Sequence, residues 1–218
     1  RQSPIHHWLA RRHPQWVELA GMPIAARFHS TEVERQTLAT LAMCDLSALP
    51  KPGVKGASAE RFLAEQPIDT PDEVYESQLL ADNSLIVRVG SDEFFLEAGV
   101  NSETVSQVAA ALESSSLDCI RVERQEATFL LIGSRVFDVM AQTCGINLRE
   151  APSGKALYTR VAGVSCCVFP GDLEGHPTLR IWVDNSYALY LWESLVEIIE
   201  ELDGTIVGAA SLYPDSLE

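Results

Sequence analysis

Several features are scarce or missing in this sequence of 218 residues, and each absence narrows the class of protein. No run of about 18 apolar residues exists, so we expect no transmembrane helix. The opening residues lack the apolar core of a signal peptide. The first residue is not methionine, which is consistent with a trimmed N-terminus. No Cys-x-x-Cys pair is present, which removes the usual spacing of a zinc site.

Sequence motifs that carry catalytic chemistry are also missing. There is no Gly-x-Gly-x-x-Gly dinucleotide fingerprint, no Walker loop, no Gly-x-Ser-x-Gly elbow and no His-Glu-x-x-His pair. His29 and His176 have no nucleophile partner nearby in the sequence, so we interpret them as structural or solvated. Acidic pairs such as Glu200-Glu201 are interpreted as charges on a helix face. We therefore predict no catalytic, cofactor-binding or metal-binding residue in this chain.

Positive charge is scarce, because 16 Lys and Arg face 31 Asp and Glu, for a net charge of −15. Such a field repels phosphate backbones and anionic membranes, so nucleic acid and membranes are not expected as partners. It suits docking onto a basic surface of another protein. The cysteines are odd in number and mostly lie in apolar runs, which predicts buried thiols without disulfides in a reducing cytoplasm; they are Cys44, Cys119, Cys144, Cys166 and Cys167.

The basic residues concentrate in residues 1–20, where three arginines and three histidines alternate with Trp8 and Trp16. We interpret this segment as a basic N-terminal arm that docks on a partner protein, since Arg and Trp are common interface anchors. Packing on its own domain ranks second, and nucleic-acid binding ranks last because the chain is acidic. Residues 21–218 are predicted to form one α+β domain, with two subdomains as an option.

Apolar periodicity predicts a mixture of strands and helices without a βαβ rhythm, which favours α+β with mainly antiparallel sheets. The strongest helix spans 185–204, with Trp192 on its apolar stripe and Gly204 as its end. Residues 84–90 and 93–99 are expected to form a hairpin. Further helices are predicted at 58–66, 101–116 and 134–146, and further strands at 25–30, 119–124, 127–133, 155–171, 178–184 and 205–213.

One loop stands out between Leu49 and Ala59, where turn-forming residues flank Lys51 and Lys55. It is suited either to cradle a phosphate or to make a tight connection into a helix capped by Ser58 and ended by Pro67. The connection is the preferred interpretation, with both lysines solvated or at an interface. Gly56 is expected to be required by backbone geometry.

Three blocks of sequence together resemble the folate-binding domain of the glycine-cleavage T-protein superfamily. The first is "CDLSALPKPGVKGASAERFL", and its matching positions are Asp45, Ser47, Val54, Gly56, Ala59, Phe62 and Leu63. The second is "FLLIGSRVFDVMAQTCGINL", and the third is "NSYALYLWESLVEIIEELDG", with Trp192 in the usual place. Within the superfamily, the chain most resembles the gamma subunits of heterotetrameric sarcosine oxidases, over roughly residues 17 to 210.

The resemblance implies a folate-binding-type α+β fold and a noncatalytic gamma-type subunit of a flavin-dependent enzyme. Such an enzyme oxidises sarcosine or another N-methyl amino acid and passes the one-carbon unit to tetrahydrofolate. The alpha, beta and delta subunits are the implied partners, and they are expected to hold FAD, FMN, NAD and tetrahydrofolate. The alternatives are a stand-alone tetrahydrofolate-dependent aminomethyltransferase-like protein and a scaffold of unrelated role.

The resemblance breaks down at one motif. Folate-binding relatives carry a Gly-Tyr-Thr-Gly-Glu-x-Gly-like segment whose acidic residue holds the pterin. The corresponding region here reads "GVSCCVFPGDLEGHPTLRI", in which only Glu174-Gly175 survives. The sequence therefore argues against folate binding by this chain.

Overall fold

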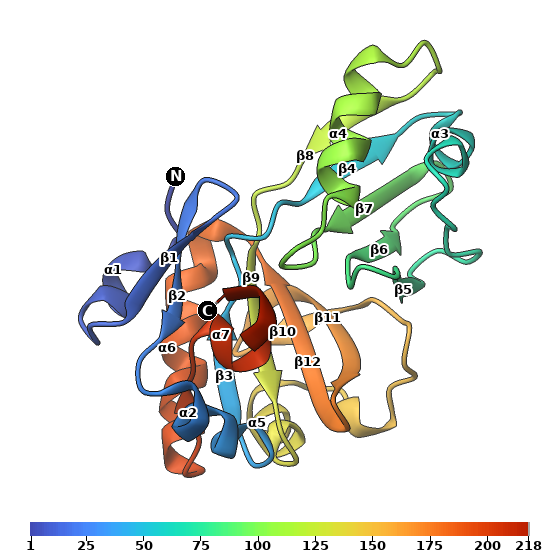
Figure 1. The fold of residues 1–218 in the computed structure, drawn as a ribbon. Helices are drawn as coiled ribbons and strands as arrows, with labels where there is room; N and C mark the ends of the chain where they lie inside the picture. Colours follow the sequence, from blue (N-terminus) through green and yellow to red (C-terminus); the bar gives the residue numbers. More distant parts are fainter. Residues whose placement is uncertain (218) are drawn as a thin grey trace. The chain divides into compact units, whose positions relative to one another are not determined.

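A computed structural model describes residues 1–217, and the chain divides into two compact units (Figure 1). Unit 1 contains residues 1–48, 126–153 and the chain from Leu157 onward. Unit 2 contains residues 49–125 together with the short return segment 154–156. Among the described residues, no helix is both long and apolar enough to cross a membrane.

Unit 1 is built on a six-stranded sheet with the order β10-β11-β12-β9-β3-β13. All its neighbouring strands are antiparallel except the pair β13 and β3. The strands are β3 (Ala42–Asp45), β9 (Ala127–Ile132), β10 (Leu157–Val161), β11 (Val164–Leu173), β12 (His176–Val183) and β13 (Thr205–Ile206). A separate two-stranded ribbon pairs β1 (Gln15–Leu19) with β2 (Met22–Arg27).

Helices α5 (Val136–Thr143) and α6 (Asn185–Glu201) bury their apolar stripes against one face of this sheet. Phe129 and Ile181 come from the sheet side of that core, and Trp192 comes from α6. The other helical segments of unit 1 are α1 (His6–Ala10), α2 (Thr31–Leu38), the 3-10 turn Leu148–Glu150, α7 (Ala209–Leu212) and α8 (Pro214–Leu217).

Residues 1–20 pack on their own unit, an outcome that the sequence analysis ranked below docking on a partner. Ile5 and Leu9 are fully buried in the core of unit 1, and the Trp8 ring lies 5.6 Å from that of Trp192. Residues 15–19 form β1, and Arg12 makes an ion pair of 2.9 Å with Glu200. The apolar residues between the basic ones give the segment its own buried face.

Unit 2 is a five-stranded antiparallel sheet with the order β5-β6-β7-β4-β8, and two helices cover one of its faces (Figure 1). Its strands are β4 (Pro52–Lys55), β5 (Ser77–Leu79), β6 (Leu85–Arg88), β7 (Glu93–Glu97) and β8 (Ile120–Glu123). Its helices are α3 (Ala59–Glu65) and α4 (Thr104–Ser114). The expected hairpin is confirmed as β6 paired with β7.

Two strand predictions need correction. The strand expected at 205–213 ends at Ile206, and the chain then forms helix α7. Gly208 lies so close to the carbonyl of Ala26 that a side chain there would collide with it. The connection between the strands predicted at 155–171 and 178–184 is a two-residue turn, because Glu174 and Gly175 both adopt positive φ and the flanking strands pair up to Leu173 and His176.

The turn into α7 is held by a buried carboxylate, that of Glu34 on α2. It accepts hydrogen bonds from the backbone N–H groups of Phe28 (2.6 Å), His29 (2.8 Å) and Gly208 (2.8 Å), and from the hydroxyl of Ser211. Glu34 is 1% exposed. One side chain therefore satisfies backbone donors next to its own helix and at Gly208, which is 174 residues away from Glu34 in the chain.

We predict that Glu34→Gln lowers the free energy of unfolding by about 3 kcal/mol, because an amide nitrogen would face buried donors. Glu32→Gln, on the exposed side of the same helix, is the matched control and should change it by less than about 0.5 kcal/mol. Urea denaturation of both variants measures the difference. Equal stabilities would show that the Glu34 carboxylate is dispensable.

Candidate functional site

The apolar residues of the first sequence block build the core of unit 2. Val54, Ala59, Phe62 and Leu63 are all buried, and they pack against the strands and α4. The spacing of these residues therefore reflects the packing of helix α3 in the core, and the residues do not form a binding surface. Ser58 occupies the position before this helix, but its side chain makes no capping hydrogen bond.

Gly56 is fixed by backbone geometry, as expected from the sequence. Its φ is +140°, and a Cβ at this position would collide with the carbonyl oxygen of Asp118. Its N–H donates to the carbonyl of Asp92 at 2.9 Å. The glycine allows the chain to turn tightly out of β4 toward α3.

The two lysines of the loop have different surroundings. Lys55 is exposed and pairs with Glu93 at 2.8 Å, in agreement with the sequence analysis. Lys51 was expected to be solvated or at an interface, but its side chain is buried inside unit 2. Its side chain is 3% exposed, its Nζ donates to the carbonyl of Leu49 at 3.0 Å, and the buried Glu97 carboxylate lies 3.6 Å away. Burial is tolerated because the opposite charge and a carbonyl compensate the ammonium.

Asp45 and Ser47 form a polar cluster at the end of β3. The Asp45 carboxylate accepts from the hydroxyl of Ser3 at 2.6 Å and from both the N–H and the hydroxyl of Ser47. Ser47 in turn accepts from the N–H of Thr128 at 3.1 Å. Burial raises the pKa of the neighbouring Cys44 thiol, and the carboxylates of Asp45 and Glu34 raise it further, so this thiol is unreactive.

The remaining residues singled out by the sequence do not converge. Glu174 lies on the β11–β12 turn, where it pairs with Arg35 at 2.9 Å and is largely exposed. Trp192 is fully buried against Phe129 and Trp8. His29 is exposed, whereas His176 is half-buried at the start of β12. Among the residues the structure describes, no group of three or more His, Cys, Asp or Glu is placed to hold a metal ion.

Unit 2 contains a groove that the sequence analysis did not identify. Its volume is about 680 Å³. One wall is the chain that leaves α3, the second is β5 with the turn after it, and the third is the start of α4. It is lined by Gln66, Pro67, Ile68, Asp69, Gln78, Leu79, Leu80, Ala81, Asp82, Thr104, Gln107 and Val108. We refer to it as the β5 groove.

The carboxylate of Asp82 is locked in its charged form within this groove. Partial burial raises its pKa, but hydrogen bonds from Ser102, Thr104 and Ser84 outweigh this and lower the pKa to about 2. Ser84 donates its N–H to Asp82 at 3.0 Å, and the hydroxyl of Ser102 also donates to the carboxylate. The negative charge lies at the start of α4, where the helix dipole favours it.

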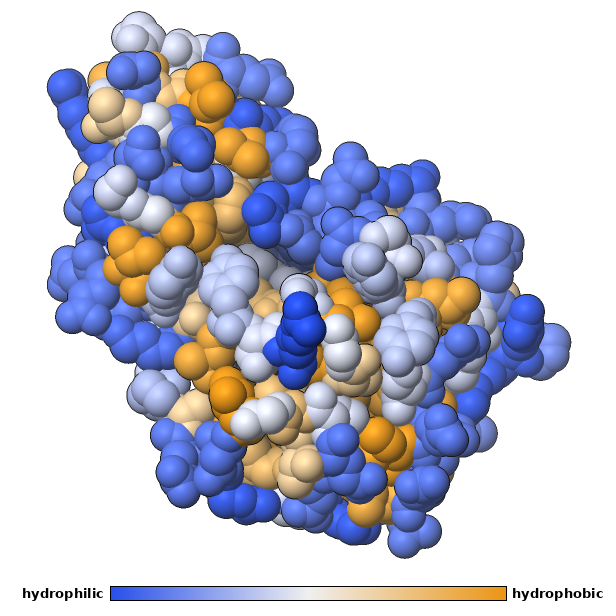
Figure 2. Space-filling model, turned by 180° about the vertical axis from the view of Figure 1, so that it is seen from behind, coloured by the Kyte–Doolittle hydropathy of each residue, from blue (hydrophilic) through white to orange (hydrophobic). Residues whose placement is uncertain are grey.

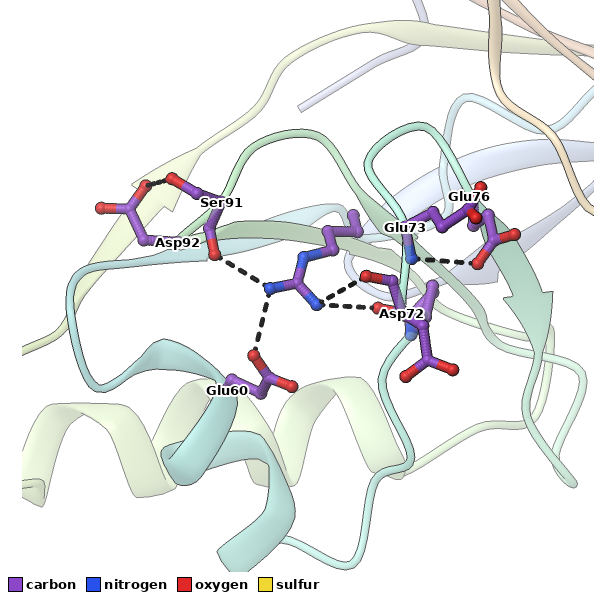
Figure 3. A network of polar contacts seen from close by, with 8 residues as sticks. Glu60, Asp72, Glu73, Glu76, Ser91 and Asp92 are labelled. Carbon is purple, nitrogen blue, oxygen red and sulfur yellow. Dashed lines mark hydrogen bonds and ion pairs between the residues drawn. The ribbon is translucent and has the colours of Figure 1, made fainter.

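The chain that joins two walls of the groove, residues 70–76, is held by a network around Arg88 of β6 (Figure 3). The Arg88 guanidinium donates to the carbonyls of Pro71 (3.1 Å), Asp72 (3.2 Å) and Ser91 (3.0 Å), and to the carboxylate of Glu60 (3.1 Å). Its side chain is 13% exposed. Shielded hydrogen bonds of this kind keep the connecting loop in one conformation.

Lys155 fixes the same loop from the other side. Its ammonium contacts Glu73 at 2.9 Å and Glu76 at 2.8 Å, and the backbone of 154–156 pairs with that of 75–77. Hydrogen bonding to Lys155 is the main cause of a lowered Glu76 pKa. The return segment of unit 2 therefore covers the first part of the outer edge of β5.

Apolar side chains also reach the surface, as the face in Figure 2 shows, where orange residues are interspersed with blue ones. Apart from these, the outer side of α6 exposes Tyr187, Leu189 and Tyr190, each between 44% and 57% exposed. Glu193 and Glu197 follow on the same exposed side of the helix. Aromatic residues are enriched at protein interfaces, whereas glutamates are depleted there, so the tyrosines rather than the glutamates point to an interface.

No protein-family model matches the chain. Among proteins of known function, it is 19% identical over 218 residues to an aminomethyltransferase of Thermoanaerobacter sp. and 20% identical over 220 residues to one of Thermoanaerobacter pseudethanolicus. Each alignment covers 92% of this chain and 59% of the relative. The sequence is thus distantly related to aminomethyltransferases, and it spans about three fifths of their length.

Two solved structures have the same architecture. Glycine cleavage system aminomethyltransferase T from Bartonella henselae matches with a TM-score of 0.78 at 17% identity, over 97% of this chain and 60% of that one. A chain of heterotetrameric sarcosine oxidase from Corynebacterium sp. U-96 matches with a TM-score of 0.67 at 19% identity, over 94% of this chain and 97% of that one. The fold is that of aminomethyltransferase T. The fold class predicted from the sequence is confirmed.

We predict that Gly56→Ala destabilises the protein by more than about 1 kcal/mol, because φ is positive and the added carbon meets the Asp118 carbonyl. Lys55→Ala, one residue earlier, removes only an exposed pair and should cost less than about 0.5 kcal/mol. Thermal melting of both variants measures this contrast. A neutral Gly56→Ala would contradict the described geometry.

The lowered pKa of Asp82 predicts a specific dependence on acid. Because the folded-state pKa of about 2 lies below the ordinary aspartate value of 3.8, the stabilising effect of the charged Asp82 is present above about pH 4 and is lost as pH falls toward 2. Asp82→Asn should therefore lose less stability than the wild type between pH 4 and pH 2. The effect should be modest because the groove is open to water. Parallel loss of melting temperature in both proteins would refute the assignment.

Proposed function

We propose that this chain is a noncatalytic gamma-type subunit of a heterotetrameric, flavin-dependent enzyme that oxidises sarcosine or a related N-methyl amino acid. The proposal rests on the share of each chain that the structural matches cover. The chain and a chain of heterotetrameric sarcosine oxidase overlap across 94% and 97% of their lengths, whereas the chain spans only 60% of aminomethyltransferase T. In this role the chain supports the catalytic subunits structurally and contributes no side chain to the catalytic reaction.

The surroundings of several candidate residues are consistent with a supporting role. Glu174, which stands nearest to the family's pterin-holding acid, lies on an exposed turn and is paired with Arg35. Lys51 and Lys55 are paired with carboxylates. The exposed Tyr187 and Tyr190 of α6 offer anchors for a neighbouring subunit.

The partners in this proposal are alpha, beta and delta subunits. FAD, FMN, NAD and tetrahydrofolate would be held by those subunits, where the hydride and one-carbon chemistry takes place. A cytoplasmic location is part of the same proposal.

The second candidate is a tetrahydrofolate-dependent aminomethyltransferase-like protein that acts alone. The distant sequence relation to aminomethyltransferases and the higher TM-score of 0.78 to aminomethyltransferase T favour it. In that case the chain itself would have to bind folate.

Affinity purification of the tagged chain from its native host distinguishes the two functions. We predict that larger subunits with a stoichiometric flavin spectrum co-purify, and that this complex oxidises sarcosine or another N-methyl amino acid. The chain purified alone should be colourless and inactive. Flavin bound to the isolated chain would contradict a supporting role.

Thermal melting of the isolated chain with tetrahydrofolate is the complementary measurement. A ligand that binds only the folded state raises the melting temperature, and the rise grows with the logarithm of ligand concentration once that concentration exceeds the Kd. We expect no rise with tetrahydrofolate. A rise that depends on concentration in this way, combined with the absence of any co-purifying flavoprotein, would replace the subunit proposal with the aminomethyltransferase-like one.

A further inference from the structure

The outer edge of β5 is only partly covered. In its pairing with β6, Gln78 faces Ile86, and the N–H of Leu80 donates back to Ser84. Because hydrogen bonding alternates along an antiparallel strand, the backbone groups of Ser77 and Leu79 point away from β6. The N–H of Ser77 donates to the carbonyl of Gly154 at 2.8 Å. Leu79 is the next outward-facing residue, it lies beyond the covering segment, and it lines the β5 groove with 59% of its surface exposed.

The groove carries negative charge that no basic side chain on its lining balances. Asp69 is exposed, and Asp82 is held in its ionised form. The basic side chains of unit 2 are engaged elsewhere, as ion pairs or over an aromatic ring: Lys51 with Glu97, Lys55 with Glu93, Arg61 with Glu65, Arg88 with Glu60, Arg121 with Glu123, Arg124 over Phe95, and Lys155 with Glu76. A cationic occupant is therefore the electrostatic complement of this surface.

Three glutamine side chains line the same groove. Gln66 ends α3, Gln78 lies on β5, and Gln107 is exposed on the first turns of α4. Each primary amide offers both donors and an acceptor, which suits the alternating N–H and C=O groups of a polypeptide backbone. Gln78 already uses its amide N–H in this way, because it donates to the backbone carbonyl of Asp69.

The connection between two groove walls is preorganised by the Arg88 network (Figure 3). A binding surface that is already ordered loses less conformational entropy when an occupant arrives. The loop 70–76 therefore supports the groove without contributing to its lining.

We propose that the β5 groove docks a short extended segment of a partner polypeptide that carries Lys or Arg side chains. The segment adds to the outer edge of β5 at Leu79, in line with residues 154–156. Its basic side chains face Asp69 and Asp82, and its backbone amides meet the glutamines. Such strand addition gains affinity from main-chain hydrogen bonds and specificity from the flanking side chains. This inference deepens the proposed function, on which the identity of the partner as a neighbouring subunit depends.

The test uses the full chain and a fluorescently labelled Lys-Val-Lys-Val-Lys-Val peptide, with binding followed by fluorescence anisotropy at low salt. We expect saturable binding that weakens as salt is raised. A Lys-Pro-Lys-Pro-Lys-Pro peptide has the same charge but lacks half of the backbone N–H donors, and it should bind roughly fivefold more weakly. Hydrogen exchange at the Leu79 amide should slow when the Lys-Val peptide is bound.

Two groove variants and a matched control locate the site. Asp69→Asn and Gln107→Lys should each weaken peptide binding by roughly fivefold, about the effect of one screened charge contact. Ala110→Lys adds the same charge at an exposed position of α4 outside the groove lining, and it should leave affinity within about twofold. Melting temperatures of the three variants confirm that each is folded.

Four outcomes would overturn the inference. The first is the absence of saturable binding, and the second is equal binding of the Lys-Val and Lys-Pro peptides. The third is equal weakening by Gln107→Lys and Ala110→Lys, which would indicate attraction to the overall charge only. Spermine that binds as tightly as the peptide, with no slowing of Leu79 exchange, would indicate a site for small cations instead.

The peptide experiment is independent of the purification that tests the subunit role. If flavoprotein subunits co-purify but the peptide does not bind, the groove inference fails and the proposed function stands. If the peptide binds at the groove but no flavoprotein co-purifies, the subunit proposal fails and the groove remains a docking site for another basic partner.

Discussion

Every buried polar group of the backbone must find a partner, and a few charged side chains of this protein meet that need where regular elements end. Glu34 collects the donors that the turn into α7 leaves open, and Asp45 anchors the end of β3 to the N-terminal segment. Arg88 does the converse and donates to three carbonyls of irregular chain in unit 2. Because an unpaired buried group costs about 1–3 kcal/mol, these side chains fix loops that apolar packing alone would leave unspecified. The shape of the β5 groove depends on this constraint.

Local patterns predicted the parts of the fold that local chemistry decides. The apolar stripes of α3 and α6, the hairpin of β6 and β7 and the need for Gly56 follow from spacing and turn chemistry within a few residues. The failures have distant causes. Residues 205–213 were predicted to form one strand, but Gly208 approaches Ala26 closely and donates to Glu34, far away in the sequence. Lys51 was expected to be solvated or at an interface because its partner Glu97 lies far away in the sequence, on β7.

The groove could not have been found from the sequence, because its residues belong to three separate elements and none belongs to a motif. Glutamines and aspartates at surface positions are common, and only tertiary structure brings Gln66, Gln78 and Gln107 onto one concave surface. The resemblance to folate-binding relatives directs attention elsewhere, to residues such as Phe62 and Trp192, which serve the core of their units. A family signature of this kind mostly records packing, so it identifies the fold more reliably than the site.

The distribution of charge favours association with basic molecules over association with acidic ones. Its net charge is −15, and within unit 2 the few basic side chains pair with acids or stack on an aromatic ring. Positive charge at an interface with this unit must therefore come largely from the other molecule. Long-range attraction would speed the encounter with a basic surface and repel other acidic proteins, whereas affinity depends on short-range contacts. An edge strand with an outward-facing backbone at Leu79 and rigid flanking loops supplies contacts of that second kind.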